Sequence, residues 1–320
     1  MGGAVVNAPA VLPTTAPRAS HALAEAARRT CLPFAREYPF EPHFLETRAG
    51  PMHYVDEGPR DASPILCVHG NPTWSFYWRR VARELGGDRR VIAPDHIGCG
   101  LSHKPANWSY RLADHVANLE ELVLGLDLWN VTLVVHDWGG AIGCGVAVRH
   151  PERFARLFVT NTAAFPEGRV PLRIQVCRTP LLGELFIRGL NAFARGAVHM
   201  AVEDASRMTP EVRRGYLAPY DSWGTRIATH RFVRDIPTGP GHPSHGTLAA
   251  IDEGLARLAD KPLRLAWGMR DWCFTPDFAA MWRARFPAAE VLELERAGHY
   301  LMEDAHEEVL PWLAEFVGEA

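Results

Sequence analysis

The sequence predicts an α/β protein that has a mostly parallel sheet, helices on both faces of the sheet, and a helical insertion. Three observations carry this prediction. Short apolar runs typical of strands alternate with longer segments whose apolar residues recur at helical spacing. The alternation stops after residue 164 and resumes after residue 245. Polar side chains directly follow several of the apolar runs, which is where parallel sheets place their sites.

The strands and helices before residue 164 follow one another in regular order. The first strand alternates apolar and polar residues, whereas the later ones are short apolar runs of the kind that is buried on both faces. The predicted strands are 52–57, 65–68, 91–93, 131–135 and 157–160. The predicted helices are 76–85, 116–126 and 139–148. This order favours a parallel sheet, because parallel neighbours need a crossover between them.

A helical cap is predicted between residues 165 and 245. This segment is rich in arginine and shows apolar residues at helical spacing, without a convincing strand. A loop rich in proline and glycine closes it at 237–243. An arginine-rich helical surface of this kind is usually solvated.

The alternation of strands and helices resumes after the cap. The predicted strands are 263–267 and 291–294, and the predicted helices are 278–286 and 307–316. An N-terminal tail rich in alanine and proline is expected to be mobile, apart from a short helix that Ser20 would cap. The resulting division is a tail at 1–36, core segments at 37–164 and 246–320, and the cap at 165–245.

The composition excludes several classes of protein. Of 320 residues, 47% are hydrophobic, which excludes a disordered chain. The net charge of −3 leaves no basic excess for phosphates, so we expect no nucleic-acid partner. No apolar run approaches the roughly 18 residues of a membrane span, and the N-terminus does not resemble a signal peptide. The six cysteines form no Cys-x-x-Cys pair, so we expect free thiols, no metal site and a cytoplasmic location.

The most informative strand end is His136-Asp137-Trp138-Gly139-Gly140. This pattern is typical of the nucleophile elbow of α/β-hydrolases. In that elbow a strand is followed by a nucleophile between two other residues, then by a glycine and a helix of small residues. The nucleophile position holds Asp137, and a carboxylate can attack carbon to form an ester. The alternative, an aspartate that merely caps the helix, is weakened because other strand ends carry matching partners.

Two of those partners are Asp271 and His299. The order Asp137, Asp271, His299 is the nucleophile, acid and histidine order of this fold. His299 would act as the general base, and Asp271 would orient its imidazole. The rival acid position follows strand 157–160, but it holds Asn161 and no carboxylate. We therefore expect Asp271 to be the orienting acid.

A leaving group that gains negative charge needs hydrogen-bond donors. In this fold one backbone donor follows the nucleophile, here at Trp138, and another comes from the loop His69-Gly70-Asn71-Pro72. The Asn71 side-chain amide and the Trp138 indole N–H are two further candidates. Core packing for Trp138 and a turn role for Asn71 are the plainer alternatives.

These motifs resemble those of haloalkane dehalogenases. The shared stretches are His69–Trp78 (HGNPTWSFYW), Val135–Gly143 (VHDWGGAIG) and Gly298-His299. More of the chain, residues 38–316 with the cap included, resembles the β-lactone decarboxylases of bacterial long-chain olefin biosynthesis. The additional matches are YVDEGP at 54–59, PDHIGCGLS at 94–102, TNTAAFP at 160–166, IRGLNAFARGA at 187–197, YLAPYDSW at 216–223 and RFVRDIP at 231–237.

The second resemblance implies an enzyme without a cofactor that converts a cis-3,4-dialkyl β-lactone into a cis-alkene and CO2. Asp137 would attack a ring carbon, while Asn71 and Trp138 would stabilise the departing carboxylate. Which carbon is attacked, and whether His299 acts as a base or only through its charge, stays open. The resemblance also implies a multienzyme assembly with a β-lactone synthetase and a reductase.

Three other readings are weighed against this one. A haloalkane dehalogenase would use His299 to activate water for hydrolysis of an alkyl ester on Asp137. An epoxide hydrolase would need acidic tyrosines in the cap, for which Tyr216 and Tyr220 are available, but it has no evident use for Asn71. A binding protein without activity would normally have lost a catalytic residue, and none is missing.

The substrate is expected to be a small apolar molecule with alkyl chains. Apolar residues of the cap would form the roof of its pocket. The candidates are Leu181, Leu182, Phe186 and Phe193 in the cap, together with Trp74 near the cleft.

Overall fold

The computed structural model describes residues 17–166 and 170–318, and within these ranges eight strands form one sheet. The strand order across the sheet is β1-β2-β4-β3-β5-β6-β7-β8. The pairs β1–β2 and β2–β4 are antiparallel, and every other pair is parallel. The strands are β1 (His43–Thr47), β2 (Gly50–Glu57), β3 (Pro64–Val68), β4 (Arg90–Pro94), β5 (Val131–Asp137), β6 (Phe154–Thr162), β7 (Leu263–Gly268) and β8 (Glu290–Leu294).

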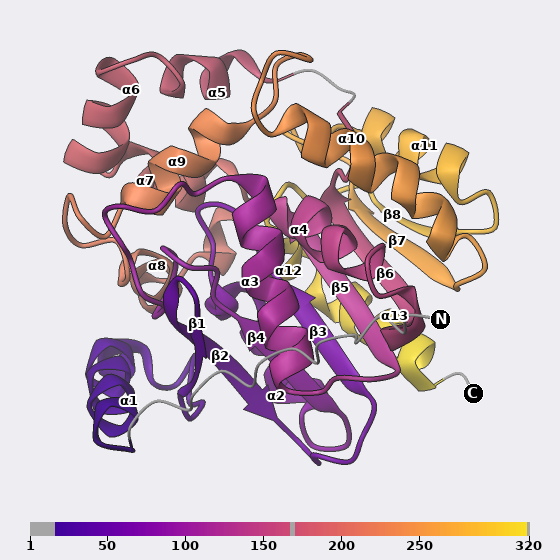
Figure 1. Ribbon diagram of the computed structural model, residues 1–320, viewed down its shortest axis with the longest axis horizontal. Helices are drawn as coiled ribbons and strands as arrows, with labels where there is room; N and C mark the ends of the chain where they lie inside the picture. The colour runs from indigo at the N-terminus through magenta and orange to yellow at the C-terminus, as the bar shows by residue number, and fades with distance from the viewer. Residues whose placement is uncertain (1–16, 167–169, 319–320) are drawn as a thin grey trace, which may run out of the picture.

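The helices lie on both faces of the sheet and beyond one of its ends (Figure 1). Those before the cap are α1 (Pro17–Cys31), α2 (Arg79–Leu85), α3 (Leu112–Gly125) and α4 (Trp138–Ala147). Those from the cap onward are α5 (Leu172–Cys177), α6 (Leu182–Glu184), α7 (Ala192–Met200), α8 (Pro210–Leu217), α9 (Ile227–Asp235), α10 (His245–Gly254), α11 (Pro276–Arg285), α12 (Leu301–Asp304) and α13 (His306–Gly318). None of the helices in the described ranges has the length and apolar character of a membrane-spanning segment.

Side-chain alternation in the strands divides the core between the two faces of the sheet. In β3, Leu66 and Val68 join a cluster that contains residues of α3, α4, α10 and α11. Their neighbours Ile65 and Cys67 join a second cluster that contains residues of α2, α12 and α13. Successive side chains of a strand point to opposite faces, so a fully apolar strand must be covered on both. The predicted fold class is confirmed.

Helices α10 and α12 were not predicted, and two elements near the start of the described chain also differ from the sequence prediction. Strand β1 was not expected, because the sequence HFLET has only two strongly apolar residues; the strand lies at the edge of the sheet and pairs only with β2. Residues 17–36 were expected to be a mobile tail with a short helix capped by Ser20; they form α1, which begins at Pro17 and so has Ser20 inside it, and the short turn Leu32–Phe34. The turn is fixed because Phe34 is fully buried against Trp74 and Phe76. The rest of the expected tail lies outside the described residues.

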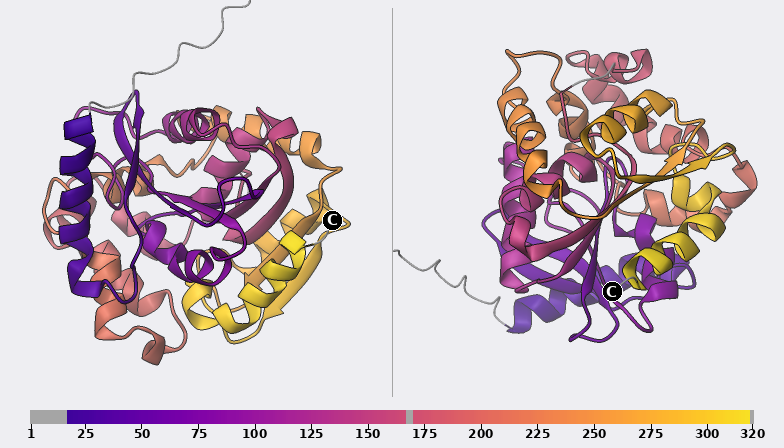
Figure 2. Two further views of the ribbon diagram at one scale, coloured as in Figure 1. Left: turned by 90° about the horizontal axis from the view of Figure 1, so that it is seen from below. Right: turned by 90° about the vertical axis from the view of Figure 1, so that its right-hand side faces the viewer.

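The cap is the segment between β6 and α10, and its described residues form only helices and turns. Figures 1 and 2 show α5 and α6 at the outer margin of the molecule, farther from the sheet than α9. A buried ion pair of the core, between α2 and α12, accepts a hydrogen bond from the cap. The Arg79 guanidinium donates to both carboxylate oxygens of Glu303 at 2.5 and 2.8 Å, and the Tyr216 hydroxyl of α8 donates to the same carboxylate at 2.6 Å. Burial raises the pKa of Glu303, but Arg79 outweighs it and the pKa is lowered.

We expect Glu303→Gln to lower the free energy of unfolding by about 3–5 kcal/mol, because it leaves the buried Arg79 charge without its main partner. Urea unfolding followed by circular dichroism measures this loss. The matched control is Glu41→Gln, which removes the exposed Arg28–Glu41 pair and should change the free energy by less than about 1 kcal/mol. Equal losses in the two variants would show that the buried pair contributes no more to stability than an exposed one.

Candidate active site

The sharp turn between β5 and α4 lifts Asp137 out of the sheet. Asp137 has φ 51° and ψ −128°, a backbone conformation that residues other than glycine rarely adopt and that is often found at functional sites. The turn is close to its neighbours on both sides. A Cβ at Gly139 would overlap the Val68 carbonyl, and a Cβ at Gly70 would overlap the Asp137 carboxylate. Glycine at these two positions is therefore a steric requirement of the elbow.

Two backbone N–H groups hold the Asp137 carboxylate. The Asn71 N–H donates to its Oδ1 at 2.6 Å, and the N–H of Trp138 also donates to it. Burial raises the pKa of Asp137, although His299 and the two N–H groups act in the opposite direction. These are the donors that the sequence analysis assigned to a developing oxyanion. In the structure they bind the carboxylate itself, so they are not free for an oxyanion of the substrate.

His299 lies between the two carboxylates. Its Nδ1 is 2.8 Å from Asp271 Oδ2, and its Nε2 is 3.8 Å from Asp137 Oδ2. The first distance is a hydrogen bond, whereas the second is too long for one. Burial alone would lower the pKa of His299, but the two carboxylates outweigh burial and raise it. A raised pKa favours a positively charged imidazole beside Asp137.

Asn161, which sequence reasoning treated only as a missing acid, positions Asp271. Its side-chain N–H donates to Asp271 Oδ2 at 3.0 Å and to the Gly268 carbonyl at 3.1 Å, and its side-chain oxygen accepts from the Gly268 N–H at 2.8 Å. The N–H groups of Cys273 and Phe274 donate to the other oxygen of Asp271. Part of the signal was present in the sequence, because Asn161 directly follows a predicted strand; that this strand lies beside the one preceding Asp271 is seen only in the structure.

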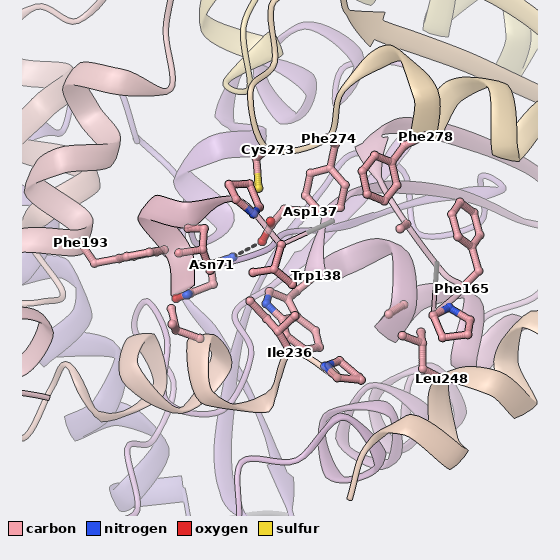
Figure 3. A pocket seen from close by; sticks show the side chains of 18 residues that line it. Asn71, Asp137, Trp138, Phe165, Phe193, Ile236, Leu248, Cys273, Phe274 and Phe278 are labelled. Carbon is pink, nitrogen blue, oxygen red and sulfur yellow. Dashed lines mark hydrogen bonds between the residues drawn. The ribbon is translucent and has the colours of Figure 1, made fainter. Parts of the chain in front are cut away.

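The predicted donors Asn71 and Trp138 both line a pocket above Asp137 (Figure 3). The cap fixes the Asn71 amide, because its Nδ2 donates to the Thr229 carbonyl of α9 at 3.2 Å. An amide nitrogen carries two hydrogens, so one N–H of Asn71 stays available to a ligand. The Trp138 ring packs against Phe232 of α9, with ring centroids 5.3 Å apart. Both groups are thus oriented by the same cap helix.

The pocket is mainly apolar and encloses about 900 Å³, its open mouth included. It has two apolar flanks that belong to different clusters of the core. One flank contains Phe165, Leu248 and Phe278, and the other contains Phe193 and Val233. Figure 3 shows Phe193 on one side of Asp137, and Phe165, Leu248 and Phe278 on the opposite side. Asp137 therefore lies between two apolar lobes.

Of the five predicted pocket residues, the structure places only Phe193 in this pocket. Leu181 and Leu182 are exposed and Phe186 is partly exposed, because the side of α6 and of the following turn that faces inward carries other residues. Trp74 is fully buried beneath the cap, where its indole N–H donates to the Gly215 carbonyl at 3.0 Å. The prediction is therefore wrong for the other four residues, because the direction in which cap side chains point depends on packing that helical spacing alone does not determine.

The two cap tyrosines that an epoxide hydrolase would need do not line the pocket. The hydroxyl of Tyr216 donates to Glu303, and that of Tyr220 donates to the Thr73 carbonyl at 3.1 Å. Both rings are buried. Neither hydroxyl is directed to a substrate above Asp137, so the site lacks the acid that epoxide opening requires.

Comparison with known proteins gives the class. The model of the alpha/beta hydrolase fold family matches residues 63–305. Solved structures with the same arrangement include an ancestral haloalkane dehalogenase, with a TM-score of 0.78 and 28% identity over 86% of this chain and 98% of that one. A haloalkane dehalogenase from Bradyrhizobium elkanii also has a TM-score of 0.78 and 28% identity, over 87% and 96%. The chain belongs to the α/β-hydrolase family.

Sequence relatives are more specific. The chain is 42% identical to the cis-3-alkyl-4-alkyloxetan-2-one decarboxylase of Shewanella oneidensis, over 88% of this chain and 89% of that one. It is 43% identical to the enzyme of the same name from Xanthomonas campestris pv. campestris, over 88% and 97%. Haloalkane dehalogenase 2 of Mycobacterium bovis is 32% identical over 88% and 96%. Both resemblances predicted from the motifs are confirmed.

We expect Asp271→Asn to lower the pKa of His299, because a neutral amide no longer favours the charged imidazole. Loss of a raised pKa also removes pH-dependent stability. In the wild type this stability is present below the pKa of an unfolded histidine, about 6.5, and is lost as the pH rises through the higher pKa of the folded state. Titration of the labelled imidazole by NMR measures the shift. His43, on the edge strand β1, is the matched control, because burial lowers its pKa and that pKa should be the same in both proteins.

Proposed function

We propose that this chain is a β-lactone decarboxylase that converts a cis-3,4-dialkyl β-lactone into a cis-alkene and CO2. The observation that carries the proposal is the difference in identity between its two groups of relatives: 42–43% to oxetanone decarboxylases, against 32% to a haloalkane dehalogenase over a similar length. An oxetan-2-one is a β-lactone. The site supports the same chemistry, because it offers a carboxylate nucleophile, two donors for a departing anion and an apolar pocket.

The position of the donors favours attack at C4. This is the alkyl-bearing ring carbon that is bonded to the ring oxygen. Attack on the lactone carbonyl would create a tetrahedral oxyanion, but the backbone N–H groups of Asn71 and Trp138 already bind the Asp137 carboxylate. Attack at C4 instead breaks the bond between C4 and the ring oxygen. The negative charge then develops on a carboxylate, to which the Asn71 amide and the Trp138 indole N–H would donate.

The second step breaks the bond between C3 and the new carboxylate. Its electron pair forms the double bond between C3 and C4, CO2 departs, and the bond between C4 and Asp137 breaks to regenerate the carboxylate. No water or proton is consumed. Inversion at C4 places the Asp137 oxygen opposite the carboxylate, so elimination from that geometry keeps the two alkyl groups of a cis-lactone on one side of the double bond. His299 then contributes positive charge beside Asp137 rather than base catalysis.

The two lobes of the pocket match a substrate with two alkyl chains. Carbons C3 and C4 would lie over Asp137, and one chain would extend toward Phe165 and Phe278 while the other extends toward Phe193. Each buried methylene is worth about 0.8 kcal/mol, so long chains would supply much of the binding free energy. A small haloalkane would fill only a fraction of this space.

Hydrolytic dehalogenation is the second candidate, and the shared fold and the 32% identity to a dehalogenase favour it. In that reaction an alkyl ester on Asp137 has no carboxylate to lose. Water must then attack the ester, with His299 as the general base. The two reactions therefore make different demands on His299 at the same site.

We further infer that the chain acts in bacterial olefin biosynthesis, in the cytoplasm, with a β-lactone synthetase and a reductase as neighbours in the reaction sequence. The supporting observations are the names and bacterial sources of the two relatives and the six cysteines, all of which are free thiols. A β-lactone must be made by an enzyme that closes the ring of a hydroxy acid.

We expect the purified chain to convert a long-chain cis-β-lactone into the cis-alkene, and to release halide from 1-halohexane poorly. Gas chromatography and a halide assay measure the two reactions side by side. In D2O the alkene should carry no deuterium, because no proton enters the product.

Asp137→Asn should abolish turnover with an unchanged circular dichroism spectrum, because an amide is nearly isosteric but cannot attack carbon. Fast halide release without alkene formation would establish the dehalogenase instead.

We expect each lobe to limit one alkyl chain. Leu248→Phe narrows the lobe of Phe165 and Phe278, and Val233→Phe narrows the lobe of Phe193. Loss of room for two methylenes, about 1.6 kcal/mol, should lower kcat/KM about tenfold for lactones with a long chain on that side. Lactones with a methyl group on that side should react normally. Leu124→Phe, on the surface of α3, is the matched control. Two variants that respond alike to every lactone would contradict separate lobes.

A further inference from the structure

Exposed large apolar side chains are concentrated on the outer part of the cap. Of the eleven that are exposed among the described residues, six lie between residues 172 and 190. We call these six the cap patch. They are Leu172, Val176, Leu181, Leu182, Leu185 and Leu190. Scattered exposed leucines need no explanation, but a cluster of this kind marks an interaction surface.

The backbone of the cap presents these side chains outward. Leu172 and Val176 are one turn apart on α5, so they share a side of that helix, while Ile174 between them points inward and lines the pocket. Leu181 is 83% exposed and has a positive φ of 60°, a conformation that is unfavourable for leucine. Leu181 thus combines an apolar side chain in water with a strained backbone. Both features lower the stability of the fold, so they point to a function.

The cap patch lies in a positively charged stretch of the chain. Residues 170–200 contain four arginines and one acid, Glu184, whereas the whole chain has a net charge of −3. Glu184 is already paired with Arg188 at 2.6 Å. Arg173 and Arg195 are exposed. Apolar side chains flanked by arginine match the surface of an anionic bilayer, where leucine enters the headgroup boundary and arginine meets lipid phosphates.

We propose that the cap patch docks on an anionic lipid bilayer. The patch is continuous with the pocket mouth, because α5 carries Leu172 and Val176 outside and Ile174 inside, and Val170 and Pro171 also line the pocket. Figures 1 and 2 show α5 and α6 at the outer margin of the molecule, where a flat surface can reach them. Docking itself does not depend on the chemistry of the site. Docking would allow the enzyme to take up a dialkyl lactone directly from the bilayer. This purpose, unlike docking itself, rests on the proposed function.

The test is co-sedimentation of the full chain with vesicles of phosphatidylcholine, either alone or with 30% phosphatidylglycerol. We expect binding to the anionic vesicles, at least fivefold weaker binding to the neutral ones, and loss of binding at high salt. Leu185→Glu/Leu190→Glu and Arg173→Glu/Arg195→Glu should each lower the bound fraction at least fivefold. Leu32→Glu is the matched control, because Leu32 is 74% exposed but lies at the end of α1. Thermal melting checks that each variant is folded.

Three outcomes would overturn the proposal. The wild type fails to bind either vesicle, or it binds both equally, or the two cap variants bind as the wild type does. Sedimentation velocity tests an alternative role of the patch. If the wild type does not bind vesicles but self-associates, and Leu185→Glu/Leu190→Glu abolishes the self-association, the patch is a protein interface. None of these measurements uses turnover, so a failure of docking is distinguishable from a failure of the proposed function.

Discussion

The carboxylate of Asp137 is buried, and two backbone N–H groups, those of Asn71 and Trp138, hold it in place. An ionised carboxylate away from water is costly unless hydrogen bonds and a nearby positive charge compensate it. The elbow meets this requirement through a strained backbone at Asp137 and through the loop of Asn71, which must come close enough that only glycine fits at position 70. His299, whose pKa is raised by Asp271 against the effect of burial, is the nearby group that can carry the compensating positive charge. The residues that position the Asp137 carboxylate at the elbow are therefore also those that make its burial possible.

The cap is coupled to this arrangement through polar contacts rather than through apolar packing alone. The Thr229 carbonyl of α9 orients the Asn71 amide, and the Tyr216 hydroxyl of α8 binds Glu303. The Tyr216 ring also stacks on Tyr300, next to His299, with centroids 5.1 Å apart. A shift of the cap would therefore change the orientation of the leaving-group donor and the packing beside His299. The shape of the pocket and the orientation of the polar groups around Asp137 therefore depend on each other in this fold.

Sequence reasoning predicted the features that depend on local pattern. Apolar runs placed the parallel strands, and the residues after them gave Asp137, Asp271 and His299, which the structure brings within hydrogen-bonding or ion-pair distance of one another. It missed features that depend on long-range packing. Strand β1 forms because an edge is available beside β2, and α1 is followed by a turn that is fixed because Phe34 meets Trp74. The direction of the leucine stripe in the cap and the link from Asn161 to Asp271 likewise follow from neighbours that are distant in the sequence.

One site geometry can serve two reactions because the covalent intermediate, and not the protein, determines the next step. In the proposed mechanisms both reactions begin with attack of Asp137 on an alkyl carbon and with an anion that leaves toward Asn71 and Trp138. An ester formed from a haloalkane has no internal leaving group, so it persists until His299 activates water. An ester formed from a β-lactone carries a carboxylate on the adjacent carbon, already opposite the Asp137 oxygen, and loss of CO2 needs neither water nor a base. The apolar lobes on either side of Asp137 favour the second course, because long alkyl chains that fill them leave little room for water to reach the ester.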